Sequence, residues 1–350
     1  MTKKKNKAVA PEYPQPVLSV FSPCSLFILL SRLCVSMGWM HSFCKVFFWL
    51  FTLCPLALKF FRPKKAKKDV IVSTYMKSGT NLAIQTALEI AWKGQAPENH
   101  HIHDIVPWPD FADQRSMVSL SKAPLSPDTG FRIIKTHANH LPYRPDVLYV
   151  VVIRDPKEVV VSAFHFVFGF LGVRSKMSID AWMEYCFDSF LYLWACHIAQ
   201  HWPWRHRPNV LLKTYQQLVA DKESATREMA EFMQVSLTEE EMQLVLDKSS
   251  FDYMKHHQGR FAPPVTVFTK EDEYPDMIRR GKVGQSDELL TASQQQAIDD
   301  YCRKTLLQLG SDFPYDEIFC HGGPPTSSRR NGKKSFVLER TRSLSTLKDD

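Results

Sequence analysis

The sequence lacks the cysteine patterns that signal a metal site or a disulfide framework. It has eight cysteines in 350 residues, but none forms a Cys-x-x-Cys pair and none combines with histidine at zinc-ligand spacing. Nothing therefore demands disulfides, and a reducing compartment is expected. His100-His101-x-His103 lies among Pro, Asn and Asp and is interpreted as a loop, so no metal is predicted. Internal repeats are also lacking, and the length allows one large domain or two smaller ones.

No apolar run reaches the roughly 18–20 residues of a comfortable membrane span, although residues 17–61 are strongly apolar. Arg32, His41 and Lys45 interrupt this segment, and Phe43 to Phe61 is the best candidate for a single crossing. A signal peptide fits poorly, because a proline-rich gap follows the basic start and no clear cleavage site exists. Lysine clusters on both sides favour an apolar helical hairpin or interfacial anchor with both ends cytoplasmic. The alternative is a buried helical pair that covers the following domain.

The excess of positive charge, +7 in all, lies largely at the ends of the chain. Residues 1–16 read as a basic disordered arm and 321–350 as a disordered basic tail. This placement predicts contact with acidic membrane surfaces or simple solvation, and it argues against a nucleic-acid partner. The catalytic or binding domain is assigned to residues 63–320, after the apolar segment 17–62.

From Asp69 onward, short β-branched runs alternate with helical periodicity. Alternation of this kind predicts an α/β fold with a P-loop-type parallel sheet flanked by helices. Ligands then bind at the carboxyl ends of the strands. The aromatic-rich stretch 179–204 is interpreted as core, and part of it, with Phe164, Phe166 and Phe168, is expected to line an apolar pocket. The predicted strands are 69–74, 131–135, 147–153 and 209–213, and the predicted helices are 80–93, 156–168, 178–202, 221–233, 238–248 and 291–309.

The most informative stretch runs from Asp69 to Asn81, where a buried strand leads through a lysine-bearing turn into a helix. The free amides and the positive dipole end of a helix N-terminus favour a bound phosphate or sulfate. Lys77 adds a point charge, and Ser78, Thr80 and Asn81 add donors. A phosphorylated ligand is therefore predicted here, although a lysine on a solvated turn would give the same pattern.

This turn is not an ordinary nucleotide P-loop. That motif places one glycine directly before the lysine and another five residues earlier, whereas here Met76 precedes Lys77 and Gly79 follows it. An ATPase loop also needs magnesium held by Ser or Thr and a nearby Asp. A shorter loop suits a single phosphate that carries a leaving group.

Two further segments carry arginines that could hold a second phosphate. Arg154 follows the predicted strand at 147–153, where its guanidinium can fork onto a phosphate, while Asp155 and Pro156 suit the start of the next helix. Arg279-Arg280-Gly281 follows an acidic turn. Each segment alone is equally consistent with a solvated basic turn.

Lys135 and His137 follow another predicted strand and point the same way in extended chain. In a transfer reaction the histidine can take a proton from an attacking hydroxyl, while the lysine stabilises charge on a bridging oxygen. His140 is an alternative base three residues further on. A lone histidine is more often packed or solvated, so this prediction depends on the segments around it.

Together, four segments resemble the sulfotransferase superfamily, specifically its cytosolic, hydroxyl- and amine-sulfating type. Tyr75 to Leu82 resembles the family's YPKSGTTW loop, and Lys135-Thr136-His137 matches its Lys-Thr-His segment. Arg154 to Phe166 resembles RNPKDxxVSxYHF, and Arg279-Arg280-Gly281 resembles the later RKG element. The segments occur in the family's order, and the resemblance covers about residues 60–315.

The resemblance implies an enzyme that transfers the sulfuryl group of 3′-phosphoadenosine-5′-phosphosulfate (PAPS) to a hydroxyl of a small lipophilic acceptor, such as a sterol, phenol or alcohol. It implies His137 as the base, with Lys77 and Lys135 steadying the transferring group in an in-line displacement without metal. The residues it implies for the donor are Lys77, Ser78, Gly79, Thr80 and Asn81 at the 5′-phosphosulfate, Arg154, Ser162, Arg279, Arg280 and Gly281 at the 3′-phosphate, and Tyr215, Ser249 and Phe251 at the adenine.

The sequence departs from the family pattern at several positions. Met76 replaces the proline of the loop, and Asn81 and Leu82 replace its second threonine and its tryptophan, which removes a stacking face for adenine. The usual Gly-Asp-Trp-Lys-Asn run after the RKG element reads Gly284-Gln285-Ser286-Asp287-Glu288. The family's C-terminal dimer motif is not recognisable, so that dimer is not predicted. The apolar N-terminal segment points to a lipophilic acceptor or a membrane-proximal enzyme.

Three alternatives stay open at this point. A membrane-anchored carbohydrate sulfotransferase would need a lumenal catalytic domain in the Golgi or endoplasmic reticulum. A small-molecule P-loop kinase would need a glycine before the lysine and a magnesium-binding aspartate, and neither is evident. A non-enzymatic nucleotide-binding protein would bind the donor product without turnover. The predicted location is the cytoplasm, at the cytosolic face of a membrane.

Overall fold

The computed structural model describes residues 68–98, 100–111, 117–139, 141–170, 174–262, 276–284 and 286–320. The predicted basic arm, the apolar segment at 17–61 and the basic tail lie outside these residues, as does His140. Among the helices of the described ranges, none is both long and apolar enough to cross a membrane. Association of residues 17–61 with a membrane therefore stays a prediction.

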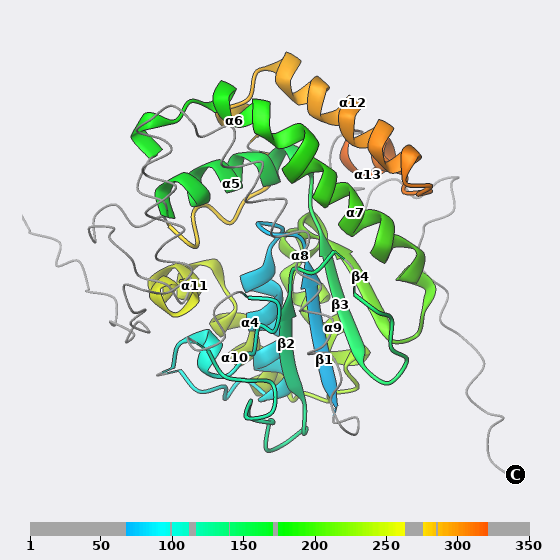
Figure 1. Cartoon of the computed structure of the whole chain (residues 1–350). Helices are drawn as coiled ribbons and strands as arrows, with labels where there is room; N and C mark the ends of the chain where they lie inside the picture. Colours follow the sequence, from blue (N-terminus) through cyan, green and yellow to red (C-terminus); the bar gives the residue numbers. More distant parts are fainter. Residues whose placement is uncertain are drawn as a thin grey trace, which may run out of the picture.

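Four parallel strands form the centre of the domain (Figure 1). The predicted parallel sheet is confirmed, and the strand at 69–74 has its predicted bounds, whereas the other three begin one residue later than predicted. The strands lie in the order β2-β1-β3-β4. They are β1 (Asp69–Thr74), β2 (Arg132–Thr136), β3 (Leu148–Ile153) and β4 (Val210–Thr214).

The strand side chains alternate between two hydrophobic cores, one on each face of the sheet. Val70 and Val72 of β1 belong to one core, whereas Ile71 between them belongs to the other. Val150 and Val151 of β3 divide in the same way. Because successive side chains of a strand point to opposite faces, an unbroken β-branched run fills both cores, as a parallel sheet covered on both faces requires.

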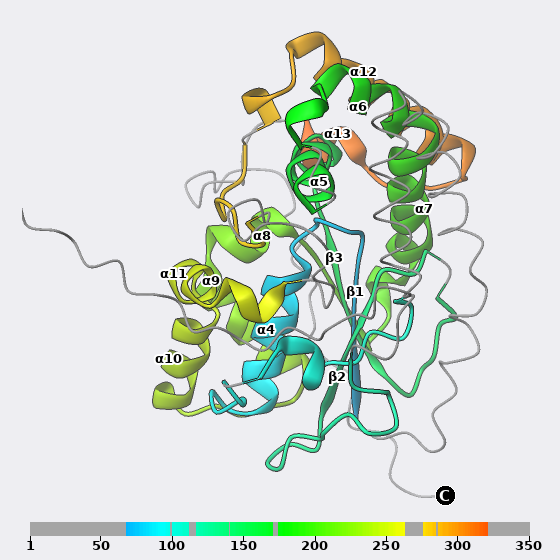
Figure 2. The same ribbon diagram turned by 60° about the vertical axis from the view of Figure 1, so that its left-hand side comes forward.

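Helices cover both faces of the sheet (Figure 2). One core is closed by α4 (Thr80–Ala91), α8 (Tyr215–Ala220), α9 (Lys222–Phe232), α10 (Glu239–Lys248) and α11 (Phe251–His256). The other is closed by α5 (Pro156–Phe170), α6 (Ile179–Tyr185), α7 (Tyr192–His201), α12 (Ala292–Gln308) and α13 (Tyr315–Phe319).

Polar caps fix where several of these helices begin. The side chains of Asp221, Thr238 and Thr291 each accept a hydrogen bond from the amide three residues later. Such caps satisfy amides that have no partner within the helix. The predicted helices 221–233, 238–248 and 291–309 are therefore confirmed to within one residue at each end.

Two helix predictions need correction. The predicted helix 178–202 is divided into α6, a π-helical turn at Cys186–Leu191, and α7. The helix predicted at 80–93 ends at Ala91, because Lys93 and Gly94 adopt positive φ angles of 52° and 79°, which no α-helix contains. The short helices α8, α11 and α13, of five or six residues each, were not predicted.

Candidate active site

A tight turn from Tyr75 to Gly79 joins the carboxyl end of β1 to helix α4. Lys77 and Gly79 both have positive φ angles, 64° and 96°, and the amide of Ser78 donates to the carbonyl of Tyr75 at 3.1 Å. A Cβ atom at Gly79 would lie 2.5 Å from Cδ2 of Tyr215. Glycine is required here both by the left-handed backbone and by the close approach of the ring.

The start of α4 offers donors to an anion. Within the described chain no side chain caps this helix, and the buried hydroxyl of Ser78 has no hydrogen-bond partner there. Buried polar groups are almost always hydrogen-bonded, and the first amides of a helix have no partner inside it. An orphaned hydroxyl beside such amides fits the oxygens of a phosphate or a phosphosulfate.

Two lysines lie at this turn, each against an aromatic ring. Nζ of Lys77 lies 4.1 Å from the ring centre of Phe166, and Nζ of Lys135 lies 3.3 Å from that of Trp108. Burial lowers the pKa of both lysines to about 7, and the charge of Lys77 contributes to the lowering at Lys135. An anion bound between them would raise both pKa values again. The pair can therefore neutralise negative charge that enters the site.

The ring of His137 is held in one orientation beside these lysines. Nδ1 lies 2.8 Å from the carbonyl oxygen of Thr74, and because a carbonyl can only accept, Nδ1 carries the proton and Nε2 keeps its lone pair. The backbone amide of His137 donates to the carboxylate of Asp110 at 2.8 Å. Burial, aided by the charges of Lys135 and Lys77, lowers the pKa of His137 to about 3. The imidazole is neutral and can accept a proton at Nε2.

Trp108 and Asp110 belong to this group and were not predicted from the sequence. Trp108 packs on Lys135 and meets the ring of His137 edge-on, with 5.1 Å between ring centroids. The segment is tied to β2 because the carbonyl of Pro107 accepts a hydrogen bond from the amide of Lys135 at 3.0 Å. The only local signal in the sequence is a Trp-Pro-Asp turn, and it does not indicate which distant residues Trp108 and Asp110 contact.

Arg154 lies at the carboxyl end of β3 and contacts the lysine-bearing turn. Its Nη1 donates to the carbonyl of Lys77 at 3.0 Å, and its Nε donates to Glu158 at 2.9 Å. The guanidinium lies 4.3 Å from the ring centre of Tyr215, the ring that also packs on Gly79. Tyr215 thus lies between the turn and Arg154 and packs against both.

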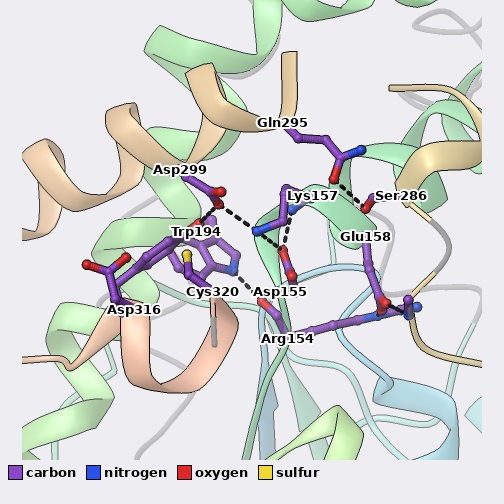
Figure 3. Close-up of polar contacts among 12 residues, drawn as sticks. Arg154, Asp155, Lys157, Glu158, Trp194, Ser286, Gln295, Asp299, Asp316 and Cys320 are labelled. Atoms are coloured by element: carbon purple, nitrogen blue, oxygen red, sulfur yellow. Dashed lines mark hydrogen bonds and ion pairs between the residues drawn. The ribbon is translucent and has the colours of Figure 1, made fainter. Parts of the chain in front are cut away.

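A buried polar network supports the backbone at Arg154 (Figure 3). The indole N–H of Trp194 donates to the carbonyl of Arg154 at 3.0 Å. Asp155 accepts from the amide of Lys157 at 2.9 Å, as its predicted capping role requires. The ammonium of Lys157 lies 3.2 Å from Asp155 and 2.6 Å from Asp299 of α12. The network joins the end of β3 to α12 and engages the ammonium of Lys157 with two carboxylates.

Arg279, Arg280 and Gly281 lie on the described segment 276–284. Both arginines contact one carboxylate, that of Glu288, at 2.6 Å and 3.0 Å. Gly281 has a φ of 64°, and a Cβ atom there would collide with the ring of Phe251. The positive charge of Arg279 is among the causes that lower the pKa of Lys77, after burial and the charge of Arg154. The backbone amide of Gly284 also donates to Glu158, the partner of Arg154, so this segment lies beside the same site.

Other predicted residues have less direct positions. The hydroxyl of Thr80 pairs with that of Thr74 at 2.6 Å, and Asn81 is partly buried in the first turn of α4. Ser249 is buried, and its hydroxyl donates to the carbonyl of Val245 at 2.6 Å, so it could only accept from a nucleotide. Ser162 is partly buried on α5. Nucleotide contacts of these residues stay predictions.

The expected aromatic lining of a pocket needs correction. Phe164 and Phe168 are buried in the core at 2% and 0% exposure, since α5 turns them toward Trp182 and its neighbours. Phe166, on a different side of the helix, is partly buried and packs against Lys77. Phe166 is thus the aromatic residue of this set that reaches the site. The interpretation of the stretch 179–204 as core is confirmed for Trp182 and Trp194, both fully buried, but not for Tyr192, which is 44% exposed.

Comparison with known proteins gives a consistent result. Residues 67–310 match the sulfotransferase domain family. Sulfotransferase 2A1 of Macaca fascicularis is 27% identical over 262 residues, which cover 71% of this chain and 88% of that protein. The 3-alpha-hydroxysteroid sulfotransferase of Cavia porcellus is 26% identical over 245 residues, covering 66% of this chain and 81% of that protein.

Solved structures show the same fold. Retinol dehydratase, crystallised with retinol and PAP, superposes with a TM-score of 0.54 at 21% identity, covering 73% of this chain and 87% of that one. The mouse sulfotransferase SULT7A1 with PAP superposes with a TM-score of 0.51 at 19% identity, covering 72% and 89%. Because the domain match spans more than half of the chain, this protein belongs to the sulfotransferase superfamily, in its hydroxyl- and amine-sulfating type, and is an enzyme of that family.

Proposed function

We propose that this protein transfers the sulfuryl group of PAPS to the hydroxyl of a small lipophilic acceptor. The observation that carries the proposal is the meeting of Lys77, Lys135 and a neutral His137 at the carboxyl ends of β1 and β2. A hydroxyl that attacks sulfur needs a base for its proton and positive charge for the oxygen that leaves. The site supplies both within one small region.

The proton goes to Nε2 of His137, because Nδ1 is already committed to the carbonyl of Thr74. The acceptor oxygen bonds to sulfur as the bond from sulfur to the phosphate oxygen breaks. Lys77 and Lys135 neutralise charge on the transferring group and on the bridging oxygen. The positive charge of these two side chains lowers the energy barrier to sulfuryl transfer. Negative charge on the donor keeps both lysines cationic when it binds.

For donor binding, the turn from Lys77 to Asn81 fits the 5′-phosphosulfate, and the orphaned hydroxyl of Ser78 is the observation that supports this fit. Arg154, Arg279 and Arg280 would hold the 3′-phosphate, with Gly281 allowing close approach of Phe251. Tyr215 and Phe251 offer faces for the adenine. Retinol dehydratase, which has the same fold, was solved with PAP and retinol and also with PAP and androsterone.

A lipophilic acceptor is favoured by the surroundings of the catalytic group. Trp108 and Phe166 pack against the two lysines, and Tyr75, Phe190 and the fully buried His197 lie behind the turn. Two relatives from Cavia porcellus are named as hydroxysteroid sulfotransferases. We extend the proposal to residues 17–61, which would attach the enzyme to the cytosolic face of a membrane, with a catalytic domain at 63–320 between disordered termini.

Two measurements on the full chain test the proposal. Calorimetric titration with 3′,5′-adenosine bisphosphate (PAP) should show tight binding, whereas ATP with magnesium should give little response. Radiolabelled PAPS should then transfer label to sterols, phenols or alcohols in a panel that also contains carbohydrates. Preference for ATP with magnesium, or label only on carbohydrates, would contradict the proposed function. Flotation with anionic vesicles, compared with a chain that begins at residue 63, tests the membrane attachment.

A further inference from the structure

The arginines expected to hold the 3′-phosphate already hold a carboxylate of this chain. Nη1 of Arg279 lies 2.9 Å and 2.6 Å from the two carboxylate oxygens of Glu288, and Nη1 of Arg280 lies 3.0 Å from one of them. Nε2 of His165 adds a third contact at 3.1 Å. Glu288 thus collects three nitrogen donors in the arrangement that a phosphate would use.

Glu288 is held on a firm support. It ends the short helical turn Ser286–Glu288, and the hydroxyl of Ser286 donates to Gln295 of α12 at 3.0 Å (Figure 3). The amide of Gln295 donates in turn to the carbonyl of Leu290 at 3.2 Å. Helix α12 is itself fixed to the end of β3 through the ion pair of Asp299 with Lys157. The carboxylate of Glu288 is therefore held beside the arginines through hydrogen bonds and an ion pair that link its turn to α12 and to the end of β3.

The electrostatics of Glu288 keep it charged in this position. Burial alone would raise its pKa, but the hydrogen bond and charge of Arg279, with His165 and Arg280, bring the pKa below its usual value. The side chain is 18% exposed, against 26% for Arg279 and 47% for Arg280. The two guanidinium groups are thus more accessible to a ligand than the carboxylate that they hold.

A carboxylate at this position is a departure of this sequence. The family run Gly-Asp-Trp-Lys-Asn reads Gly284-Gln285-Ser286-Asp287-Glu288, so glutamate stands where the family pattern has a neutral asparagine. An asparagine cannot neutralise two guanidinium groups, whereas a glutamate can. The substitution therefore changes the charge that a nucleotide meets at the arginines.

We infer that Glu288 is an internal competitor for the 3′-phosphate and weakens the binding of nucleotides that carry one, because they must first displace its carboxylate from Arg279 and Arg280. The inference rests on the proposed function, because it assigns Arg279 and Arg280 to the PAPS 3′-phosphate. A phosphate dianion offers three oxygens and more charge than a carboxylate, so it can displace Glu288 from both arginines. A nucleotide without that group leaves the Glu288 contacts intact and gains nothing from the arginines.

The variant Glu288→Gln tests the inference, because it keeps the shape and one acceptor oxygen but removes the charge. Its matched control is Asp287→Asn, which removes a charge from the exposed neighbouring residue. Each full-length protein is titrated by calorimetry with PAP and with 5′-AMP, which lacks the 3′-phosphate. Releasing two part-exposed ion pairs should make PAP binding about three- to thirtyfold tighter in E288Q. Affinity for 5′-AMP, and both affinities of D287N, should match the unaltered protein.

The possible results are distinct. Unchanged or weaker PAP binding by E288Q would overturn the inference, as would an equal gain in D287N or an equal gain for 5′-AMP. If E288Q does not fold, Glu288→Asp withdraws the carboxylate by one methylene and should still tighten PAP binding; no gain overturns the inference there too. If no version, including the unaltered protein, binds PAP, the proposed function fails and the inference fails with it. PAP binding by the unaltered protein without a gain in the variants rejects only the competitor role.

Discussion

Replacing Gly79 with alanine tests how the lysine-bearing turn is built. The residue has a φ of 96°, and an L-residue in left-handed backbone costs about 1–2 kcal/mol. The added Cβ would lie 2.5 Å from the ring of Tyr215, which forces the ring to move, and overpacking of this kind costs about 1–3 kcal/mol. Alanine also restricts the unfolded chain, which returns roughly 0.4–1 kcal/mol. The expected net loss of stability is about 1–5 kcal/mol.

The two contributions can be separated with a double-mutant cycle. In a Tyr215→Ala background the collision disappears and only the backbone cost is left, so Gly79→Ala should cost about 1–3 kcal/mol less there. Tyr215→Phe is the matched control, because it keeps the ring and should keep the full penalty. Urea unfolding of all single and double variants gives the coupling energy. A coupling near zero would refute the claim that the ring requires glycine at position 79.

Three further predictions concern the core, the base and the 3′-phosphate site. Glu89 is fully buried, and burial raises its pKa to about 7 from 4.5. The contribution of Glu89 to stability is therefore fully present below pH 4.5, and about 3 kcal/mol of it is lost as the pH rises from there through 7. Glu89→Gln should flatten that profile in urea titrations at pH 5 and pH 8, and a slope identical to that of the unaltered protein would contradict it. His137→Ala should abolish transfer of label from PAPS while calorimetry still detects PAP binding; undiminished turnover rejects His137 as the base. Arg154→Ala should weaken PAP binding by about 1.5–3 kcal/mol, and calorimetry that finds no loss would show that Arg154 does not hold the 3′-phosphate.

Features that depend on neighbours along the chain could be predicted from the sequence. The β-branched run at 69–74 specifies a strand buried on both faces, and the glycine after Lys77 marks the turn that precedes α4. Threonine or aspartate at a helix start, as at Thr238 and Asp221, fixes the first helical residue by a local hydrogen bond. These signals depend on interactions between residues close together in the sequence, so they can be recognised without knowledge of the fold.

Features that depend on distant segments could not be predicted. Asp110 meets the amide of His137 across 27 residues, and nothing local in its Pro-Asp-Phe sequence indicates that contact. Tyr215 was assigned to the adenine from resemblance, but its packing on both Gly79 and Arg154 appears only when β1, β3 and β4 lie side by side. The pairing of Glu288 with the arginines is of the same kind, since a charge in a loop is usually solvated.

The order of strands in the sheet has a consequence for how the site comes into being. Of the four strands, β1 is synthesised first, but its partners β2 and β3 begin only at residues 132 and 148. The fourth strand, β4, which pairs with β3, begins at residue 210. Parallel pairing across such sequence separations makes folding slow and leaves strand edges open until late. Tyr215 and Arg279, which complete the surroundings of the turn, are synthesised later still. The protein should therefore bind the donor only after the last cooperative step of folding. PAPS would then stabilise the folded protein and would not assist the folding of partly folded chains.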